Sequence, residues 1–312
     1  MYGYVQWLGR RAMLALAASA LISACGSPAS SGATRFPTGT VVPVVATTTV
    51  FADLVQQVGG SRVDVRSLVP KGGEVHTFDP TPSDVQKITE AKVIVRNGLG
   101  LDDWLTALAE DAGTSAPIVT LGEGLDGVTY LEGEGGAGSV NPHLWLDVAY
   151  ASKYVDRIQA ALTDVDPAGA SEYAARASAY KAVLTALDAD VRQRLDALPA
   201  SNRVVVSFHD AFPYFAAAYG LTVVGTIIDA PGQDPSAGQI ADLVRAIRAS
   251  GAKAIFAEAQ FSDALVKAVA SETGATVVSD LYDDTLGDAP VDTYVGMMTW
   301  NADRVVDALR SR

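Results

Sequence analysis

Cysteine is almost absent from this sequence, and positive charge is scarce. The only cysteine among 312 residues is Cys25, which excludes an intramolecular disulfide. Lysine and arginine number 23 against 36 aspartates and glutamates, giving a formal net charge of −13. Because such an acidic protein repels polyanions, nucleic acids and anionic membrane surfaces are not expected as partners. With 49% hydrophobic and 19% charged residues, the composition is that of a globular protein.

The N-terminal segment has the features of a bacterial lipoprotein signal. Two arginines precede an apolar stretch, residues 12–22, that is too short to span a bilayer in the mature protein. The sequence Ile-Ser-Ala-Cys that ends at Cys25 resembles a lipobox, whose cysteine carries lipid after cleavage. We predict a signal peptide over 1–24, lipidation of Cys25 and a flexible tether over 25–40. An ordinary signal peptide cut nearby is the alternative.

Short β-branched runs alternate with amphipathic stretches between residues 41 and 165 and again between 200 and 312. In the first part the strands are predicted at 41–49, 63–69, 92–98 and 117–121. In the second part they are predicted at 203–208, 221–228, 252–258 and 275–280. This repeated strand–helix pattern predicts an α/β fold of two similar lobes, each with a parallel-type sheet covered by helices.

The segment between the lobes, residues 166–199, predicts one long helix. From Pro167 to Leu198 it has no further proline, and it has no glycine after Gly169. Apolar residues recur at helical steps, at Tyr173, Tyr180, Leu184, Leu187, Val191, Leu195 and Leu198. At about 1.5 Å per residue the helix would be on the order of 45 Å long. We interpret it as a backbone that links the lobes, with a long core helix of a single domain as the alternative.

The three histidines lie in segments that are predicted to be loops after strands. His76, His143 and His209 are separated by 67 and 66 residues, and Asp280 follows 71 residues later. Ligands of open α/β sheets bind beyond the carboxyl ends of the strands, so two candidates from each lobe would meet if the lobes face each other. Three imidazoles and a carboxylate can form a four-coordinate shell for a divalent transition metal. If only the number and spacing of the histidines are considered, three unrelated surface or core histidines are the alternative.

Five motifs resemble, in order, those of the metal-binding solute receptors of bacterial ABC importers, the zinc and manganese group. They are PKGGEVHTFDPTPSDV (70–85), NGLGLDDWL (97–105), NPHLWLD (141–147), SFHDAFPYFAAAYGL (207–221) and FAEAQFS (256–262). The resemblance implies two α/β lobes joined by one long helix, with metal held in the interlobe cleft by His76, His143, His209 and Asp280. It also implies a receptor, expected to be monomeric, that delivers its metal to an ABC permease. We expect this receptor at the outer face of the cytoplasmic membrane, attached only through lipid at Cys25.

Two features bear on the identity of the metal. Three imidazoles and one carboxylate favour a borderline metal over Ca²⁺ or Mg²⁺, and Zn²⁺ outcompetes Mn²⁺ and Fe²⁺ by affinity. The acidic, Gly-rich segment 122–140 lacks the histidines that zinc members often carry there, whereas His209 stands where manganese members commonly have glutamate. We therefore expect Zn²⁺, with Mn²⁺ or Fe²⁺ as the alternative.

Several carboxylates near the ligands have more than one possible role. Asp147 and Asp210 can orient histidine rings, although helix capping or solvation is the commoner role, and Glu74 can add a ligand or a counter-charge. Glu258 can be structural or can act as the base of a metallohydrolase, which would need an open coordination position. No HExxH motif, nucleophile elbow, phosphate loop or dinucleotide fingerprint is present. We therefore expect a binding protein and no enzyme, with a metal-binding surface adhesin as a further alternative.

Overall fold

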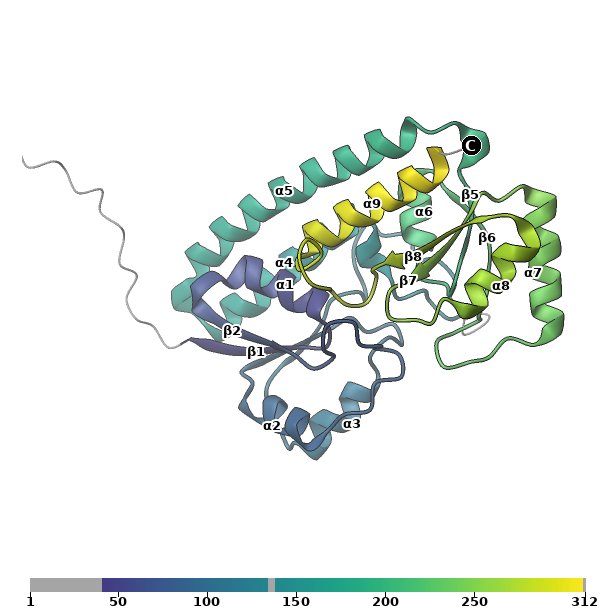
Figure 1. The fold of residues 1–312 in the computed structure, drawn as a ribbon. Coiled ribbons are helices and arrows are strands. Elements are labelled where there is room, and N and C mark those ends of the chain that lie inside the picture. The colour runs from purple at the N-terminus through teal and green to yellow at the C-terminus, as the bar shows by residue number, and fades with distance from the viewer. Residues whose placement is uncertain (1–40, 134–137, 311–312) are drawn as a thin grey trace, which may run out of the picture. The chain divides into compact units, whose positions relative to one another are not determined.

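The computed structural model describes residues 41–133 and 138–310. The predicted signal peptide, Cys25 and the tether lie outside these ranges, as does part of the acidic segment 122–140. The described residues form two four-stranded sheets in which every strand is parallel to its neighbours. Figure 1 shows the two sheets with helices around them.

The two sheets have the same topology. The first has the order β2-β1-β3-β4 and is built from β1 (Val42–Ala46), β2 (Val63–Ser67), β3 (Val93–Arg96) and β4 (Ile118–Thr120). The second has the order β6-β5-β7-β8 and is built from β5 (Val204–Ser207), β6 (Thr222–Thr226), β7 (Ala254–Glu258) and β8 (Thr276–Leu281). In both, the chain starts at an inner strand, and this repetition confirms the predicted α/β fold with two similar halves.

Helices connect the strands of each half. The first half contains α1 (Thr49–Gly59), α2 (Pro82–Glu90), α3 (Trp104–Asp111) and α4 (Val148–Val165). The second half contains α6 (Pro213–Tyr219), α7 (Ala237–Ser250), α8 (Ala264–Thr273) and α9 (Tyr294–Arg310). None of the described helices combines the length and the apolar character that a membrane-spanning helix requires.

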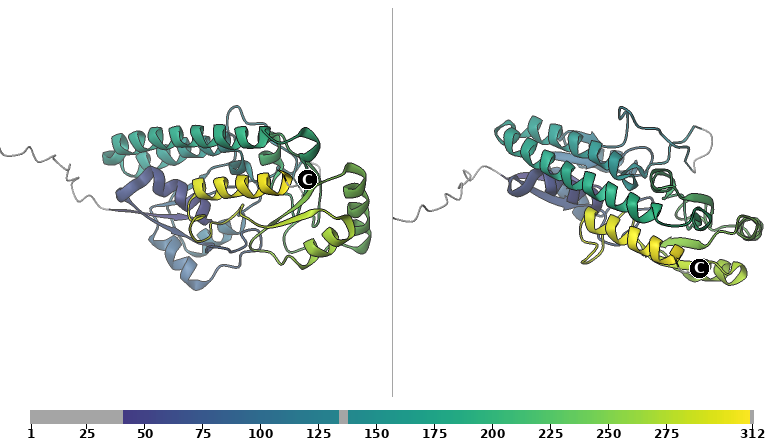
Figure 2. Two further views of the ribbon diagram at one scale, coloured as in Figure 1. Left: turned by 45° about the horizontal axis from the view of Figure 1, so that its top comes forward. Right: turned by 90° about the horizontal axis from the view of Figure 1, so that it is seen from above.

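The long helix predicted between the halves is α5 (Ala170–Asp196), with 27 residues. The apolar stripe predicted from its sequence is buried, including Tyr173, Leu184 and Leu195. α5 packs against α1 and α4 of the first half and against α6 and α9 of the second half, and Figure 2 shows α9 running beside it. The lobe limits at residues 165 and 200 stay a prediction.

Alternate strand residues face opposite helical layers, as the pleat of a strand requires. Val44 packs with α1, α4 and α5, whereas its neighbour Val45 packs with α2 and α3. In the second sheet Phe256 joins the layer of α5, α6 and α9, whereas Ile255 faces α7 and α8. Val44 and Phe256 belong to one continuous apolar cluster, so the loops of both halves extend from a shared core.

Candidate metal centre

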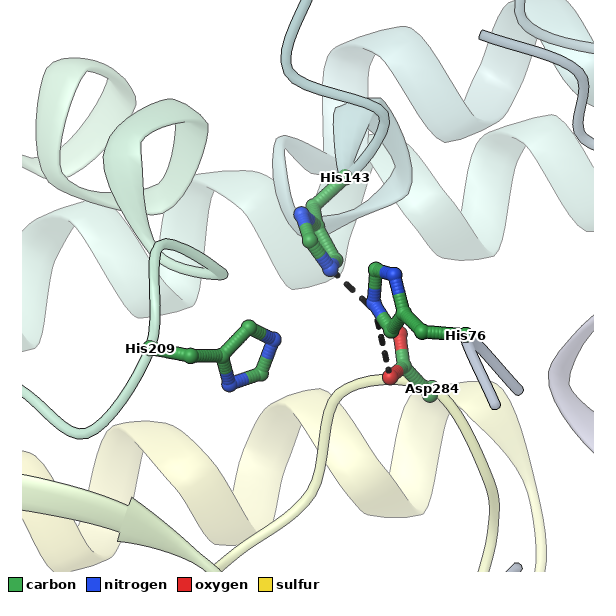
Figure 3. Close-up of side chains that lie close together, drawn as sticks. All are labelled: His76, His143, His209 and Asp284. Atoms are coloured by element: carbon green, nitrogen blue, oxygen red, sulfur yellow. Dashed lines mark ion pairs between the residues drawn. The ribbon is translucent and has the colours of Figure 1, made fainter. Parts of the chain in front are cut away.

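Three histidines and one aspartate converge at the carboxyl ends of the strands (Figure 3). Each of His76, His143, His209 and Asp284 offers one ligand atom, and these atoms lie within 4.8 Å of one another. The Nε2 atoms of His76 and His143 each lie 3.5 Å from an oxygen of Asp284. Zinc with bonds of about 2.0–2.1 Å in a tetrahedral shell places neighbouring donors about 3.3–3.4 Å apart. The two distances to Asp284 are close to this value, and the 4.8 Å limit brings His209 into the same group.

Each of the four side chains comes from a different loop. His76 lies between β2 and α2, and His143 lies between β4 and α4. His209 follows β5, and Asp284 follows β8. The loops that carry His76 and His143 each end at a capped helix. A capping box with proline in the first turn begins α2. The Asp147 side chain accepts the N–H of Ala149 at the beginning of α4. Asp147 is therefore a helix cap.

Asp280, the predicted fourth ligand, lies outside this cluster. β8 continues to Leu281, so Asp280 is a residue of the strand and does not follow it. Its side chain is 43% exposed, and its carboxylate pairs with Arg304 of α9 at 2.9 Å. The fully buried Asp284 stands with the histidines instead. The predicted strand ended too early. The acidic pair Asp283–Asp284 was the available sequence signal for the loop that carries Asp284.

Buried polar atoms without hydrogen-bond partners are concentrated at this cluster. Of thirteen such side-chain atoms among the described residues, ten belong to seven residues around it. These residues are His76, His143, His209, Asp284, Glu74, Glu258 and Asp283. An unsatisfied buried polar group costs about 1–3 kcal/mol. Their concentration at one point, with the Nε2 atoms of all three histidines among them, is what a cation-binding site requires.

Asn141 orients the ring of His143. Its Nδ2 donates to the backbone oxygen of Asp210 at 2.6 Å and to the carboxylate at 3.0 Å. Its Oδ1 therefore faces His143, where it accepts the backbone N–H at 3.0 Å and lies 3.1 Å from ring Nδ1. Only a protonated Nδ1 satisfies this contact, which leaves Nε2 unprotonated toward the cluster. Asp210 thus acts on His143 through Asn141, a relationship that its place beside His209 in the sequence does not indicate.

Glu258 faces the other side of His209. Its Oε1 lies 3.2 Å from Nδ1 of His209, and both side chains are fully buried. A carboxylate behind the ring of a metal-binding histidine sets the orientation of that ring and raises its basicity. This geometry favours the structural role over the catalytic one for Glu258.

Burial and the neighbouring carboxylates together set the charge of the histidines. It lowers the pKa of His76 to about 3, and neighbouring His209 adds to this effect. It also holds the pKa of His143 well below the usual value. Burial by itself would lower the pKa of His209 too, but Glu258 and the adjacent aspartates raise it well above the usual value. His76 and His143 are therefore neutral at pH 7, as metal ligands must be.

The carboxyl groups of the cluster respond in the opposite sense. Burial raises the pKa of Glu74 to about 7 and that of Glu258 to about 6. Burial and the neighbouring Asp283 raise the pKa of Asp284 well above the usual value. A dication favours the ionised form of these groups, so its binding would displace protons from them.

Comparison with known proteins agrees with this geometry. The family profile of the periplasmic zinc-uptake complex component A, ZnuA, matches residues 44–308. The manganese-binding lipoprotein MntA of Halalkalibacterium halodurans is 31% identical over 273 residues, which cover 87% of this chain and 89% of the relative. The iron ABC transporter substrate-binding lipoprotein MtsA of Streptococcus pyogenes is 29% identical over 97% of this chain and 99% of the relative.

Solved structures show the same similarity. The periplasmic zinc binding protein TroA of Treponema pallidum has a TM-score of 0.79 and 30% identity, covering 86% of this chain and 99% of its own. The Mn-bound periplasmic metal binding protein of candidatus Liberibacter asiaticus has a TM-score of 0.77 and 26% identity, with the same coverage. The chain therefore belongs to the ZnuA family of periplasmic metal-binding proteins, and it is a substrate-binding component of a metal ABC transporter, not an enzyme.

Proposed function

We propose that this protein captures Zn²⁺ with His76, His143, His209 and Asp284 and delivers it to the permease of its transporter. The observation that carries this proposal is the convergence of four donor groups within 4.8 Å, with Nε2 of each histidine and both oxygens of Asp284 buried and without hydrogen-bond partners. Four protein donors close a tetrahedral shell and leave no position for a reacting substrate, which suits binding. In this proposal Asp284 replaces Asp280 in the predicted ligand set.

The choice of Zn²⁺ rests on the donors. Three imidazole nitrogens and one carboxylate favour a borderline metal, and affinity at such a site is higher for Zn²⁺ than for Mn²⁺ or Fe²⁺. The names of the relatives mention manganese, iron and zinc. A receptor for Mn²⁺ or Fe²⁺ is therefore the alternative, and a titration with all three metals distinguishes it from a Zn²⁺ receptor. No observation favours the adhesin alternative, which is not part of the proposal.

We also propose that lipid on Cys25 holds a monomeric receptor at the outer face of the cytoplasmic membrane. The relatives MntA and MtsA are named lipoproteins. Because α5 packs against both halves, it restrains large hinge motions. Metal release would then use the loops after β5 and β8, which carry His209 and Asp284.

Titration of the lipid-free protein with Zn²⁺, Mn²⁺ and Fe²⁺ tests this function. We expect one tightly bound Zn²⁺ per chain, a weaker Mn²⁺ complex, and a loss of at least about 100-fold in Zn²⁺ affinity in His209→Ala. Zinc binding that survives the loss of His209 would refute the ligand set. Tighter binding of Mn²⁺ or Fe²⁺ than of Zn²⁺ would refute the choice of metal.

A further inference from the structure

Asp283 precedes Asp284 and faces the cluster from the side of His209. It is fully buried. Its Oδ2 lies 3.5 Å from Nε2 of His209 and has no hydrogen-bond partner among the described residues. In Figure 3, Nε2 of His209 is the ring nitrogen turned toward the other ligands. Its Oδ1 accepts Nε2–H of Gln260 at 2.9 Å, and its backbone oxygen accepts Nε1–H of Trp145 at 2.8 Å. The protein thus holds one carboxylate oxygen and leaves the other available for a cation.

Asp283 stands at the edge of the four-donor shell. The ligand atoms of the three histidines and Asp284 form one group within 4.8 Å, and Asp283 forms a second group of that size with His209 and Glu258. A tetrahedral ion with bonds of about 2.0–2.1 Å completes its shell within the first group. An ion with longer metal–ligand bonds and a higher coordination number can be reached by Asp283. The four donors of the first group leave some of its coordination positions unfilled, and Asp283 can take one of them.

The number of available oxygens matches such an ion. Both oxygens of Asp284 are without hydrogen-bond partners, as is Oδ2 of Asp283. Together with one nitrogen from each of three histidines they make six donors, half of them carboxylate oxygens. Carboxylate oxygens in an octahedral arrangement suit Mn²⁺, whereas Zn²⁺ in closed protein sites is almost always four-coordinate.

We propose that Asp283 is a specificity-determining ligand that joins the shell for Mn²⁺ and stays outside it for Zn²⁺. The proposal rests on the proposed function, because it takes the three histidines and Asp284 as the ligands of both ions. It gives the site a means of accepting a larger divalent ion without giving up its tetrahedral arrangement for zinc.

Asp283→Asn and Asp280→Asn provide a matched pair, since each removes one negative charge from the same segment. Asp280 pairs with Arg304 away from the cluster, so its variant reports the effect of charge alone. We expect Asp283→Asn to weaken Mn²⁺ binding on the order of 10–100-fold relative to Asp280→Asn. In Asp283→Asn, Zn²⁺ affinity should fall by a smaller factor than Mn²⁺ affinity, because the variant takes a nearby charge from the zinc site but no bond to the ion. Equal losses for both ions, or no loss for Mn²⁺, would overturn the proposal.

X-ray absorption on the wild-type protein gives a second test that does not depend on the folding of a variant. We expect about four donors around Zn²⁺ and about six, oxygen-enriched, around Mn²⁺. The same coordination number for both ions would overturn the role of Asp283. Failure of the proposed function would look different, because the wild-type protein would then bind neither ion tightly.

Discussion

Nδ1 of His209 lies 3.2 Å from Oε1 of Glu258, and water reaches neither side chain. The carboxylate faces Nδ1, which leaves Nε2 directed at the cluster, and its charge favours a cation beyond the ring. Glu258 is the last residue of β7, and His209 follows β5, its neighbour in the sheet. The pairing of these two strands thus sets the position of a proposed ligand.

Replacing Glu258 by glutamine keeps the size of the side chain and removes its charge. We expect Glu258→Gln to lower Zn²⁺ affinity on the order of 10–100-fold with the fold retained, as measured by competition with a chelator and by circular dichroism. Glu110→Gln, on the exposed side of α3, should leave the affinity unchanged. Wild-type affinity in Glu258→Gln would contradict the role given to this contact.

Asparagine at positions 284 and 280 distinguishes the two candidates for the fourth ligand. Asp284→Asn removes the carboxylate of the proposed fourth ligand, so we expect Zn²⁺ affinity to fall by at least about 100-fold. Asp280→Asn removes only an exposed ion pair with Arg304, which contributes about 0–1 kcal/mol to stability. Its Zn²⁺ affinity should stay close to that of the wild type in the same titration. The reverse order of the two affinities would restore Asp280 as the ligand.

Glu74 should make the metal-free protein less stable as the pH rises, whereas the buried neutral His76 and His143 act in the opposite sense below about pH 6.5. The pKa of Glu74 is about 7 in the folded protein against an ordinary 4.5, so folding favours its protonated form. This contribution is complete below about pH 4.5 and is lost as the pH passes 7. Glu74→Gln still accepts the N–H of His76. Between pH 5 and pH 8, the change in its unfolding free energy should be more favourable to the folded state than that of the wild type by about 1–3 kcal/mol.

Urea unfolding in the presence of a chelator measures this difference. Metal binding should respond to pH in the opposite direction, because a cation displaces the protons that the site holds. Affinity should therefore rise between pH 6 and 8, by about tenfold per pH unit for each proton released. A Glu74→Gln protein whose unfolding has the pH dependence of the wild type would contradict the assignment to Glu74.

Asn141 should be needed for metal binding although it does not face the cation. Asn141→Ala removes the acceptor that keeps Nδ1 of His143 protonated, and we expect Zn²⁺ affinity to fall on the order of 10–100-fold. Asn202→Ala is the control, since Asn202 is also buried but donates to the backbone of Leu309 far along α9. Both variants should be destabilised, and only Asn141→Ala should bind Zn²⁺ weakly in equilibrium titrations. Equal affinities would remove Asn141 from the site.

Adjacent residues of α5 should differ sharply in their effect on stability. Leu184 is 1% exposed in the shared core, and its neighbour Val183 is 47% exposed. Leu184→Ala should cost about 2–5 kcal/mol of unfolding free energy, whereas Val183→Ala should stay within about 0.5 kcal/mol. Denaturant unfolding measures both. Similar values would mean that the buried stripe of α5 does not hold the halves together.

The fold was predictable because its signals repeat over many residues. Alternating runs of strand and helix fit only a few α/β arrangements, and the stripe from Tyr173 to Leu195 has a helical period over several turns. The three histidines could be chosen by the same reasoning, because each occurs alone in a loop at the carboxyl end of a sheet.

Prediction of the fourth residue of the cluster depended on where a single strand, β8, ends. Asp280, Asp283 and Asp284 lie within five residues, and the end of β8 decides which of them reaches the histidines. Strand ends carry no strong local signal, so a shift of one or two residues exchanged the exposed Asp280 for the buried Asp284. The link from Asp210 through Asn141 to His143 joins the two halves of the chain, and no local pattern contains it.

The four residues of the cluster have a consequence for the order of folding. Their loops are separated by more than sixty residues each, and His76 and Asp284 belong to different sheets. No two of them can meet early through a short loop, and contacts between distant segments form late. A cation that needs all four donors is therefore not expected to act as a folding nucleus for this chain. Because Asp284 follows β8, the proposed site is complete only after this last strand has joined its sheet. A partly folded receptor would therefore not bind the cation.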